Sequence, residues 1–430
     1  MPSAVISRKL IIASRFFAIM AMICVCAIAN AQTQRTIKIS GKINAADDGQ
    51  PIRQVTITID KKGVGTSTNA SGEFLLFIPL TNLHDTLRIS CIGYKTRQLP
   101  ANSLKDGQHL NLSLEKSATD LKEVTITFYD AQKILAKALS RIPENYINHP
   151  HILRGFYRMY SYTDTIPLQL SEAVFDVYNF GYADKRADVF RLIKARNAKN
   201  DRDMEFLEVG QKPNSIFADD VINHLFSVGF LNEEGIQNHD FEVQGVVDYQ
   251  GYRAFQINFK GKKGVEDATY HGKIYVDTKS YAFIGFDYGL NLSAANYLVP
   301  GSLIAQALTK KMACDVTVKQ DHVEVTYQQV GKSWVLAKVN TENTLAITDS
   351  ATSFHLKPHI RFNYQVTSVD TVAKESLSGK MGRFESINEH DSSISSSFWN
   401  DYNILLSDEN AEGIFQKIKK INTDNKKVSR

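Results

Sequence analysis

The chain has 430 residues and a formal net charge of +4, with 43% hydrophobic and 22% charged residues. At roughly 150 residues per domain, this length predicts two or three domains. The first 31 residues contain three basic and no acidic side chains, so residues 32–430 carry 47 basic and 46 acidic groups. This balance argues against a nucleic acid partner.

The N-terminus has the pattern of a secretory signal peptide. Basic residues precede the apolar run FFAIMAMICVCAIA, which ends in Ala29-Asn30-Ala31, the small-x-small pattern of a signal peptidase site. The run is shorter than the ~20 residues that a membrane-spanning helix needs. We therefore predict cleavage before Gln32 and an exported protein, located in the periplasm or associated with the outer membrane.

Cys91 and Cys314 are the cysteines that remain after this cleavage. In an exported protein they could form a disulfide bond. Each also lies in an alternating apolar run that is typical of a strand, and this favours two separately buried thiols. The sequence leaves both arrangements open.

Residues 36–116 have the pattern of a small β-sandwich, with about six or seven short strands and no helix. Apolar residues alternate with polar ones in TIKISGKI, VTITID, EFLLFI, DTLRISC and LNLSLEK. Between two of these runs lies GTSTNASGEFLL, residues 65–76, where Asn69 and Gly72 predict the turn of a hairpin. A phosphate-binding loop would need a helix after the glycines, and this stretch has none.

The motifs ISGKI, Gly49-Gln50-Pro51, GTSTNASGEF and CIGYKT carry a family resemblance. Together they resemble the carboxypeptidase-regulatory-like domain, a transthyretin-like β-sandwich at the start of many exported proteins of Gram-negative bacteria. LKEVTI, residues 121–126, resembles the segment that follows this domain in longer members. The resemblance implies an Ig/transthyretin-like sandwich over most of residues 36–116.

An amphipathic helix follows, because apolar residues from Ala131 to Ile142 recur at three-and-four spacing before Pro143. The chain then returns to long strands and hairpins, such as the one that turns at residues 277–280. Serial antiparallel strands with one wet face predict a larger curved antiparallel sheet or open barrel. The expected fold is therefore mainly β with a few helices.

The order of the helix, GFYR, LSEAVFDVY and finally FWNDYNIL at 398–405 resembles the uncharacterised domain that commonly follows the regulatory-like domain. The hairpin GKIYVDTKSYAFIGFDY further resembles the lipoprotein-carrier fold, a half-closed sheet around an apolar cavity. The predicted organisation is a signal peptide (1–31), the sandwich (36–116), a linker and amphipathic helix (117–145), a β-rich domain (146–370) and a C-terminal extension with a short helix at 409–420 and a basic tail (371–430).

One set of residues matches the ligand pattern of a zinc carboxypeptidase. His239 and Glu242 form a His-x-x-Glu pair, and His355 follows 116 residues later. However, alternation along a strand places His239 and Glu242 on opposite faces, so that the two ligands diverge. We therefore predict no metal site and no cofactor.

Other groups that could carry chemistry show no selective spacing. Glu172 and Asp176, together with Glu205 and Glu208, offer carboxylate pairs for glycoside hydrolysis. The basic run at 185–202 could suit a membrane surface, but nearby carboxylates dilute its charge, and we predict an ordinary solvated loop or helix face.

The sequence thus predicts a non-enzymatic exported binding or scaffold protein of the cell envelope. Its partner would be an envelope protein, a glycan or a lipid, either on the sandwich or in the concavity of the large sheet. The alternative is a hydrolase that acts on glycans or peptides through an unrecognised active site. A cleft with converging ionisable groups would favour the enzyme, and an apolar concavity would favour the binder.

Overall fold

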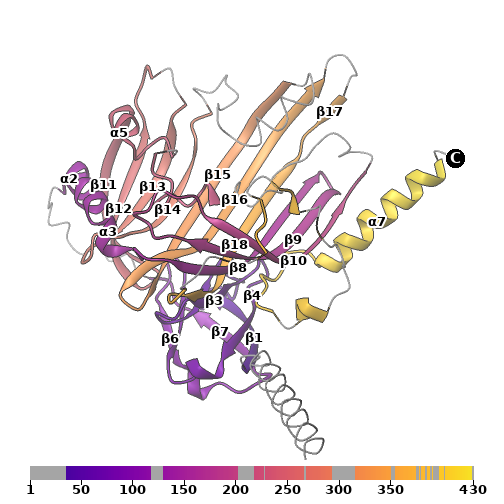
Figure 1. The fold of residues 1–430 in the computed structure, drawn as a ribbon, viewed down its shortest axis with the longest axis horizontal. Helices are drawn as coiled ribbons and strands as arrows, with labels where there is room; N and C mark the ends of the chain where they lie inside the picture. The colour runs from indigo at the N-terminus through magenta and orange to yellow at the C-terminus, as the bar shows by residue number, and fades with distance from the viewer. Residues whose placement is uncertain are drawn as a thin grey trace, which may run out of the picture.

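The computed structural model describes residues 35–117, 129–201, 217–292, 315–349 and 354–428, except for short gaps at 227, 266–267, 374–376, 378, 383–384, 388–389, 391–396 and 401. The predicted signal peptide, the LKEVTI segment and Cys314 lie outside the described residues. The chain forms a small β-sandwich below one large antiparallel sheet (Figure 1). The predicted mainly β fold class is confirmed.

The sandwich packs a three-stranded sheet, in the order β4-β1-β7, against a four-stranded sheet, in the order β3-β2-β5-β6. Along β1 every second residue is buried, and its Ile39 and Ile43 meet Ile57 of the other sheet in one apolar core. The elements are β1 (Thr36–Ala45), β2 (Thr56–Ile59), β3 (Val64–Ser67), β4 (Glu73–Pro79), η1 (Leu80–Asn82), β5 (Thr86–Ser90), β6 (Arg97–Pro100), η2 (Ala101–Ser103) and β7 (His109–Leu114).

The predicted hairpin at residues 65–76 is wrong, although its turn is correct. β3 pairs with β2, whereas β4 pairs with β1, so this stretch carries the chain from one sheet of the sandwich to the other. Gly72 has the positive φ of 75° that the turn requires. Alternation identifies each strand, but it does not identify the partner of that strand.

The large sheet has the order β10-β9-β8-β18-β16-β15-β14-β13-β12-β11, with β17 on β16. Among the described strands its two end strands do not meet, so the sheet is open rather than closed. The strands are β8 (His151–Thr163), β9 (Ile166–Asn179), β10 (Val189–Lys199), β11 (His239–Tyr249), β12 (Tyr252–Gly261), β13 (Tyr270–Asp277), β14 (Phe283–Leu290), β15 (Asp315–Val330), β16 (Ser333–Asp349), β17 (Phe354–Leu356) and β18 (His359–Asp370).

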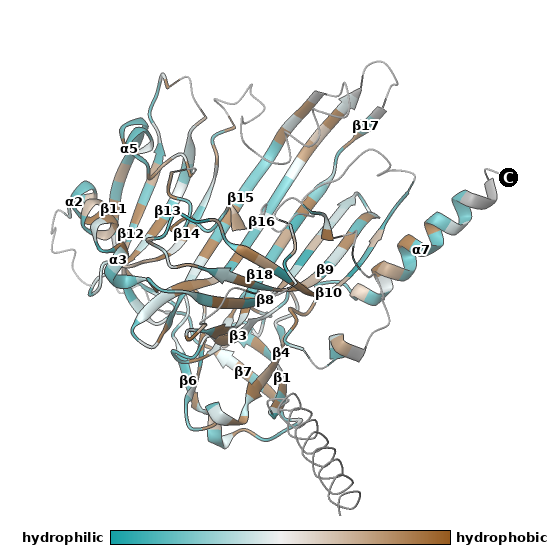
Figure 2. Cartoon of the chain, viewed as in Figure 1, coloured by the Kyte–Doolittle hydropathy of each residue, from teal (hydrophilic) through white to brown (hydrophobic). Residues whose placement is uncertain are grey.

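The two faces of this sheet differ sharply in polarity, as the alternating bands along β15 and β16 show (Figure 2). One row of paired residues crosses ten strands on what we call the inner face, and every member is apolar or aromatic: Val243, Ile257, Ile274, Phe286, Val325, Val339, Tyr364, Tyr157, Ala173 and Ala195. The inner face therefore contains the main core.

Segments of the same chain cover the inner face. α2 (Ala131–Ser140), α3 (Ile142–Asn145) and apolar residues between 217 and 231, including Phe217 and Phe230, join the core of the sheet in one cluster. Pro143 does not simply stop the predicted helix, because it lies in the first turn of α3, where a missing N–H costs nothing. A further helix, α5 (Glu233–Asn238), leads into β11.

The sandwich and the C-terminal extension cover the other, outer face over β8, β9, β10 and β18. β3 contacts β18, and η4 (Ser397–Asn400) and α7 (Ala411–Val428) lie near β8–β10, with the end of α7 extending away from the sheet (Figure 1). The predicted helix at 409–420 and basic tail were wrong in extent, because α7 continues through the tail to Val428. The prediction of one solvent-exposed face is also wrong for this part of the sheet, because β9 is buried on both faces.

Candidate functional site

A row of polar and charged residues crosses the outer face, next to the apolar row of the inner face. Its members pair across ten strands: Glu242, Asn258, Lys273, Asp287, Glu324, Asn340, Asn363, Arg158, Glu172 and Arg196. Asn363 donates to Asn340, and Asn340 donates to Glu324, each over 2.9 Å. The row is exposed at Glu242 and buried at Glu172.

At the buried end, each carboxylate lies between two arginines from the neighbouring strands. Glu172 accepts from Arg158 and from Arg196, in both cases from Nε over 2.6 Å. Asp176 likewise lies between two arginines and accepts from Arg154 through Nε and Nη2 and from Arg191 through Nη2. Both carboxylates have no exposed side-chain surface. The two candidates for glycoside hydrolysis are therefore neutralised by arginines, whereas Glu205 and Glu208 lie outside the described residues.

The arginines of the basic run at 185–202 form part of this structure. The run was predicted as a loop or helix face, but residues 189–199 form strand β10. A β-bulge between Leu192 and Lys194 shifts the alternation of β10, so that Arg191 and Arg196, five residues apart, both lie on the outer face, where buried carboxylates meet them. The guanidinium of Arg196 also lies 4.6 Å from the ring of Trp399 and 5.1 Å from that of Phe415.

A pocket, which we call the seam pocket, lies where the sandwich, the outer face and the C-terminal extension meet. Its volume is about 90 Å³, which is room for several waters or one side chain. Its lining carries far more polar than apolar side chains, including the cations Arg53, Arg158, Lys338 and Arg361 and the acids Asp408 and Glu409. The pocket thus joins three segments that are distant in sequence.

The turn of GTSTNASGEFLL forms one wall of this pocket. The Asn69 side-chain oxygen accepts from the backbone N–H groups of Ser71 and Glu73, over 3.0 and 2.8 Å, which fixes the side chain in an Asx-type turn. The backbone N–H of Ala70 then points into the pocket and donates to Asp408 Oδ1 over 2.6 Å. The turn therefore does bind a carboxylate, and that carboxylate belongs to the same chain.

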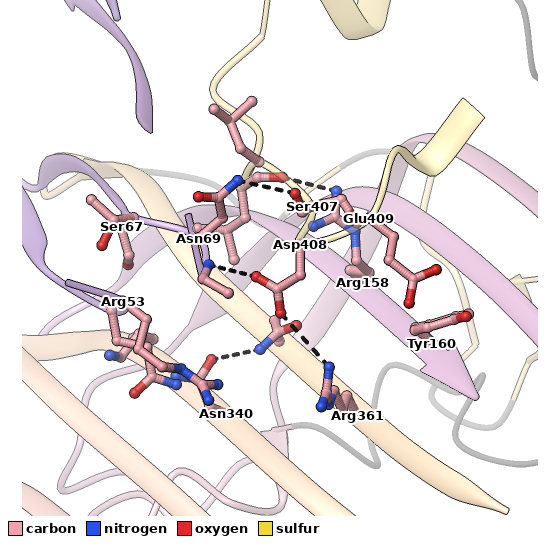
Figure 3. A pocket seen from close by; sticks show the side chains of 17 residues that line it. Arg53, Ser67, Asn69, Arg158, Tyr160, Asn340, Arg361, Ser407, Asp408 and Glu409 are labelled. Carbon is pink, nitrogen blue, oxygen red and sulfur yellow. Dashed lines mark hydrogen bonds and ion pairs between the residues drawn. The ribbon is translucent and has the colours of Figure 1, made fainter. Parts of the chain in front are cut away.

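Figure 3 shows Asp408 between the turn of the sandwich and the sheet. On its second side the carboxylate lies 3.7 Å from Arg361, which also lies 3.8 Å from Glu342. The neighbouring Glu409 faces Tyr160, and burial, followed by this carboxylate, raises the pKa of Tyr160 to about 12. Asp408 itself is more than a third exposed.

The predicted metal candidates are not brought together. His239 is buried at the start of β11, where Nδ1 lies 2.7 Å from the Gly235 carbonyl and Nε2 accepts from Tyr270 N over 2.9 Å. Glu242 is exposed on the opposite face of β11, and His355 lies on β17, across the sheet. Burial lowers the pKa of His239. The described residues contain no cluster of three or more metal-ligating side chains.

A buried carboxylate on the inner side, Asp220, was missed by the sequence analysis. It accepts from the hydroxyl of Tyr327 over 2.6 Å, and the same hydroxyl accepts from the backbone N–H of Ile222 over 3.0 Å. Burial raises the pKa of Asp220 to about 6. The available signal was an acidic pair, Asp219-Asp220, inside an otherwise apolar segment.

Cys91 is half-buried and forms no disulfide bond with another residue in the described part of the chain. Burial raises its pKa to about 11, so the thiol stays protonated and unreactive near neutral pH. Because Cys314 lies outside the described residues, the arrangement of the two cysteines stays a prediction.

Comparisons with known proteins support the predicted resemblance for the first domain. Residues 39–126 match the model of the CarboxypepD_reg-like domain. No curated protein matches the chain. In the described residues, no helix is both long enough and apolar enough to cross a membrane.

Solved structures resemble the larger domain only distantly. A DUF1329 family protein from Desulfovibrio piger is 10% identical, with a TM-score of 0.28, 57% of this chain and 95% of that chain being covered. A domain assigned to outer-membrane lipoprotein sorting from Vibrio parahaemolyticus is 11% identical, with a TM-score of 0.25, and the match covers 57% of this chain and 95% of that chain. A LolA superfamily protein from Nitrosomonas europaea is 9% identical, with a TM-score of 0.19, and the match covers 58% of this chain and 96% of that chain. At these values the likeness carries no functional argument. The chain therefore carries a CarboxypepD_reg-like domain at residues 39–126, followed by a β-rich region.

Proposed function

We propose that this protein is a non-enzymatic binding or scaffold protein of the cell envelope and that it binds its partner at the seam pocket. The observation that carries the proposal is the convergence of the CarboxypepD_reg-like domain, the polar outer face and the C-terminal extension on one partly exposed carboxylate, Asp408. Donors that already bind one carboxylate form a binding site without any further rearrangement.

The inner face is the weaker candidate for a ligand site. The predicted concavity for an apolar or sugar ligand contains Tyr146, Phe217 and Phe230 of the same chain, packed on the sheet. A ligand there would have to displace these side chains and lose their packing. The outer face is the better candidate, because its polar groups around Arg361 are partly exposed to solvent and a ligand there would leave the packing of the main core intact.

The hydrolase alternative lacks support from the carboxylates that suggested it. A catalytic acid or nucleophile must reach substrate, whereas Glu172 and Asp176 are completely covered and each paired with two arginines. For this reason we favour binding over catalysis.

Export is testable with the full chain expressed in a Gram-negative host. The signal peptide pattern at residues 1–31 predicts that the protein in the periplasmic or outer-membrane fraction begins at Gln32. Edman sequencing of that fraction identifies the first residue. A cytoplasmic protein that retains Met1 would contradict the proposed location.

Native mass spectrometry of the exported protein tests the binding site. A co-purified ligand or partner should be present on the wild type and at least tenfold depleted on Arg361→Gln. The matched control, Arg186→Gln, removes an arginine from an exposed pair with Asp184 and should retain the ligand. Stoichiometric zinc that a chelator removes and that His239→Ala lacks would instead support a metallopeptidase.

A further inference from the structure

Residues 402–409, which we call the C-terminal strap, lie in the seam without forming a helix or strand. Side chains of the sandwich and the sheet bind its backbone at alternate positions. Arg158 donates to the Leu405 carbonyl over 2.8 Å, and Asn69 donates to the Ser407 carbonyl over 3.1 Å. Contacts with every second carbonyl are the pattern by which proteins recognise an extended peptide.

The strap also contacts the edge strand of the sandwich. The side-chain amide of Asn403 accepts from the backbone N–H of Phe77 over 2.6 Å and donates to the Phe77 carbonyl over 3.2 Å. One side chain thus satisfies both backbone groups of a residue on β4, which has β1 on its other side. Ile404 and Leu405 pack against the cluster of Phe156, Val174 and Trp399.

The groups that bind the strap are oriented without it. Arg158 is fixed by Glu172, and Asn69 is fixed by the N–H groups of its own turn. Arg361, by contrast, lies near the outer limit of ion pairing from both Glu342 and Asp408. The groove is therefore preorganised, and a loosely paired cation, Arg361, faces the acidic end of the strap.

The geometry points to a peptide-binding groove in the seam that takes an extended acidic peptide and that the chain's own strap now occupies. The inference rests on the proposed function and names its ligand class: an apolar pair followed, three or four residues later, by a carboxylate. A partner with such a segment would displace the strap, because Ser407 is held by one hydrogen bond and Asp408 by one hydrogen bond and one long ion pair at a partly exposed site. The strap competes with such a partner for the groove, and because it is part of the same chain its effective concentration at the groove is in the roughly millimolar range.

A labelled peptide with the sequence of residues 402–410 tests this inference by fluorescence anisotropy on the full chain. The double variant Asn403→Ala/Asp408→Asn weakens the strap and leaves the groove intact, so it should bind the peptide at least tenfold more tightly than the wild type. Adding Arg361→Gln should reverse this gain, whereas adding Arg186→Gln should not. A peptide with Asn in place of Asp408 should bind at least fivefold more weakly.

Hydrogen exchange gives a readout that does not depend on affinity. In the double variant, the amides of Ala70 and Phe77 should lose protection while Ile39, within the β1–β4 ladder, keeps it. Saturating free peptide should then restore protection. Equal peptide affinity for wild type and double variant, or protection that free peptide does not restore, overturns the inference. If these tests fail while a co-purified ligand still depends on Arg361, the proposed function stands without it.

Discussion

Glu172 shows how strongly one residue can depend on its partners. Its carboxylate has no exposed surface and lies between Arg158 and Arg196, both of which are nearly buried as well. A fully desolvated ion pair contributes little net stability, but the loss of one partner leaves uncompensated charge in a medium of low polarity. The loss of the Glu172 carboxylate would leave two buried arginines without their negative partner.

Glu172→Gln should therefore lower the free energy of unfolding by about 3–5 kcal/mol. The matched control is Glu144→Gln, which breaks the exposed i,i+3 pair with Arg141 and should cost less than about 1 kcal/mol. Urea unfolding of the three proteins measures the difference. Similar small losses for both variants would contradict the buried pairing.

Asp220 predicts a dependence of stability on pH. Its pKa is 3.8 as an ordinary carboxyl group and about 6 in the folded protein, because burial disfavours the charged form. The folded state thus retains this proton more tightly than the unfolded chain does. Its stabilising contribution is complete below pH 3.8 and is lost as the pH rises through about 6.

Asp220→Asn should remove this loss, because the amide stays neutral and still accepts from Tyr327. We expect the variant to match the wild type near pH 4 and to be more stable at pH 7.5, by on the order of 3 kcal/mol. Thermal unfolding between pH 4 and 8 measures this, and Asp219, whose pKa burial raises to about 7, contributes to the slope that remains near pH 7. Asp164→Asn, in the exposed turn after β8, should retain the wild-type profile.

At the scale of the elements, α7 closes the outer face over β9 and β10. Its Phe415 and Ile418 are buried against Leu170. The side chain of Asn422 donates to the carbonyl of Lys199, the last residue of β10, and accepts from the backbone N–H of Asp201. The helix is amphipathic, and its polar face is exposed. Most of its stability should therefore come from this one apolar stripe.

Phe415→Ala should destabilise the docked helix by about 3–5 kcal/mol, because it leaves a cavity over Leu170 and removes the ring next to Arg196. Gln416→Ala changes the exposed side of the same turn and should have little effect. Limited proteolysis of α7 measures the outcome. Equal cleavage rates for the two variants would show that the helix is not docked through this face.

At the scale of the whole molecule, the sandwich docks closely on the large sheet. Ser67 Oγ donates to Gln365 over 2.8 Å in a buried contact, and Gly331 N donates to the Lys61 carbonyl over 3.0 Å. At Gly63 a Cβ atom would lie 2.6 Å from Val369 of β18, and φ is +67°. The interface therefore leaves no room for a side chain at this turn.

A comparison of Gly63→Ala with Gly49→Ala distinguishes the stability lost through disturbed docking from the stability lost through backbone strain. Gly49 has nearly the same φ, +70°, but a Cβ atom there meets nothing within 4 Å. In both variants the free energy of unfolding should fall by about 1 kcal/mol, because alanine must adopt the left-handed backbone conformation. Only Gly63→Ala should in addition disturb the interface and lower the unfolding temperature further in calorimetry. Equal losses would mean that the sandwich does not dock through this turn.

Local patterns in the sequence were sufficient to predict where the strands and many of their turns lie. Alternation determines which face a residue occupies, and for this reason it correctly placed His239 and Glu242 on opposite sides of β11. Turn residues determine where a strand ends, as at the hairpin between β13 and β14. The motifs of the CarboxypepD_reg-like domain could likewise be recognised without a structure.

The tertiary structure alone decided which strands pair and which faces are buried. β18 returns from far along the chain to lie between β8 and β16, and residues 65–76 cross between two sheets instead of forming a hairpin. The charged residues of β10 looked solvated, because an isolated strand carries no information about what covers its outer face. Docking of α7 and η4 covers that face. Docking of the sandwich and the C-terminal strap brings Asp408 to the turn at Ala70, 338 residues away.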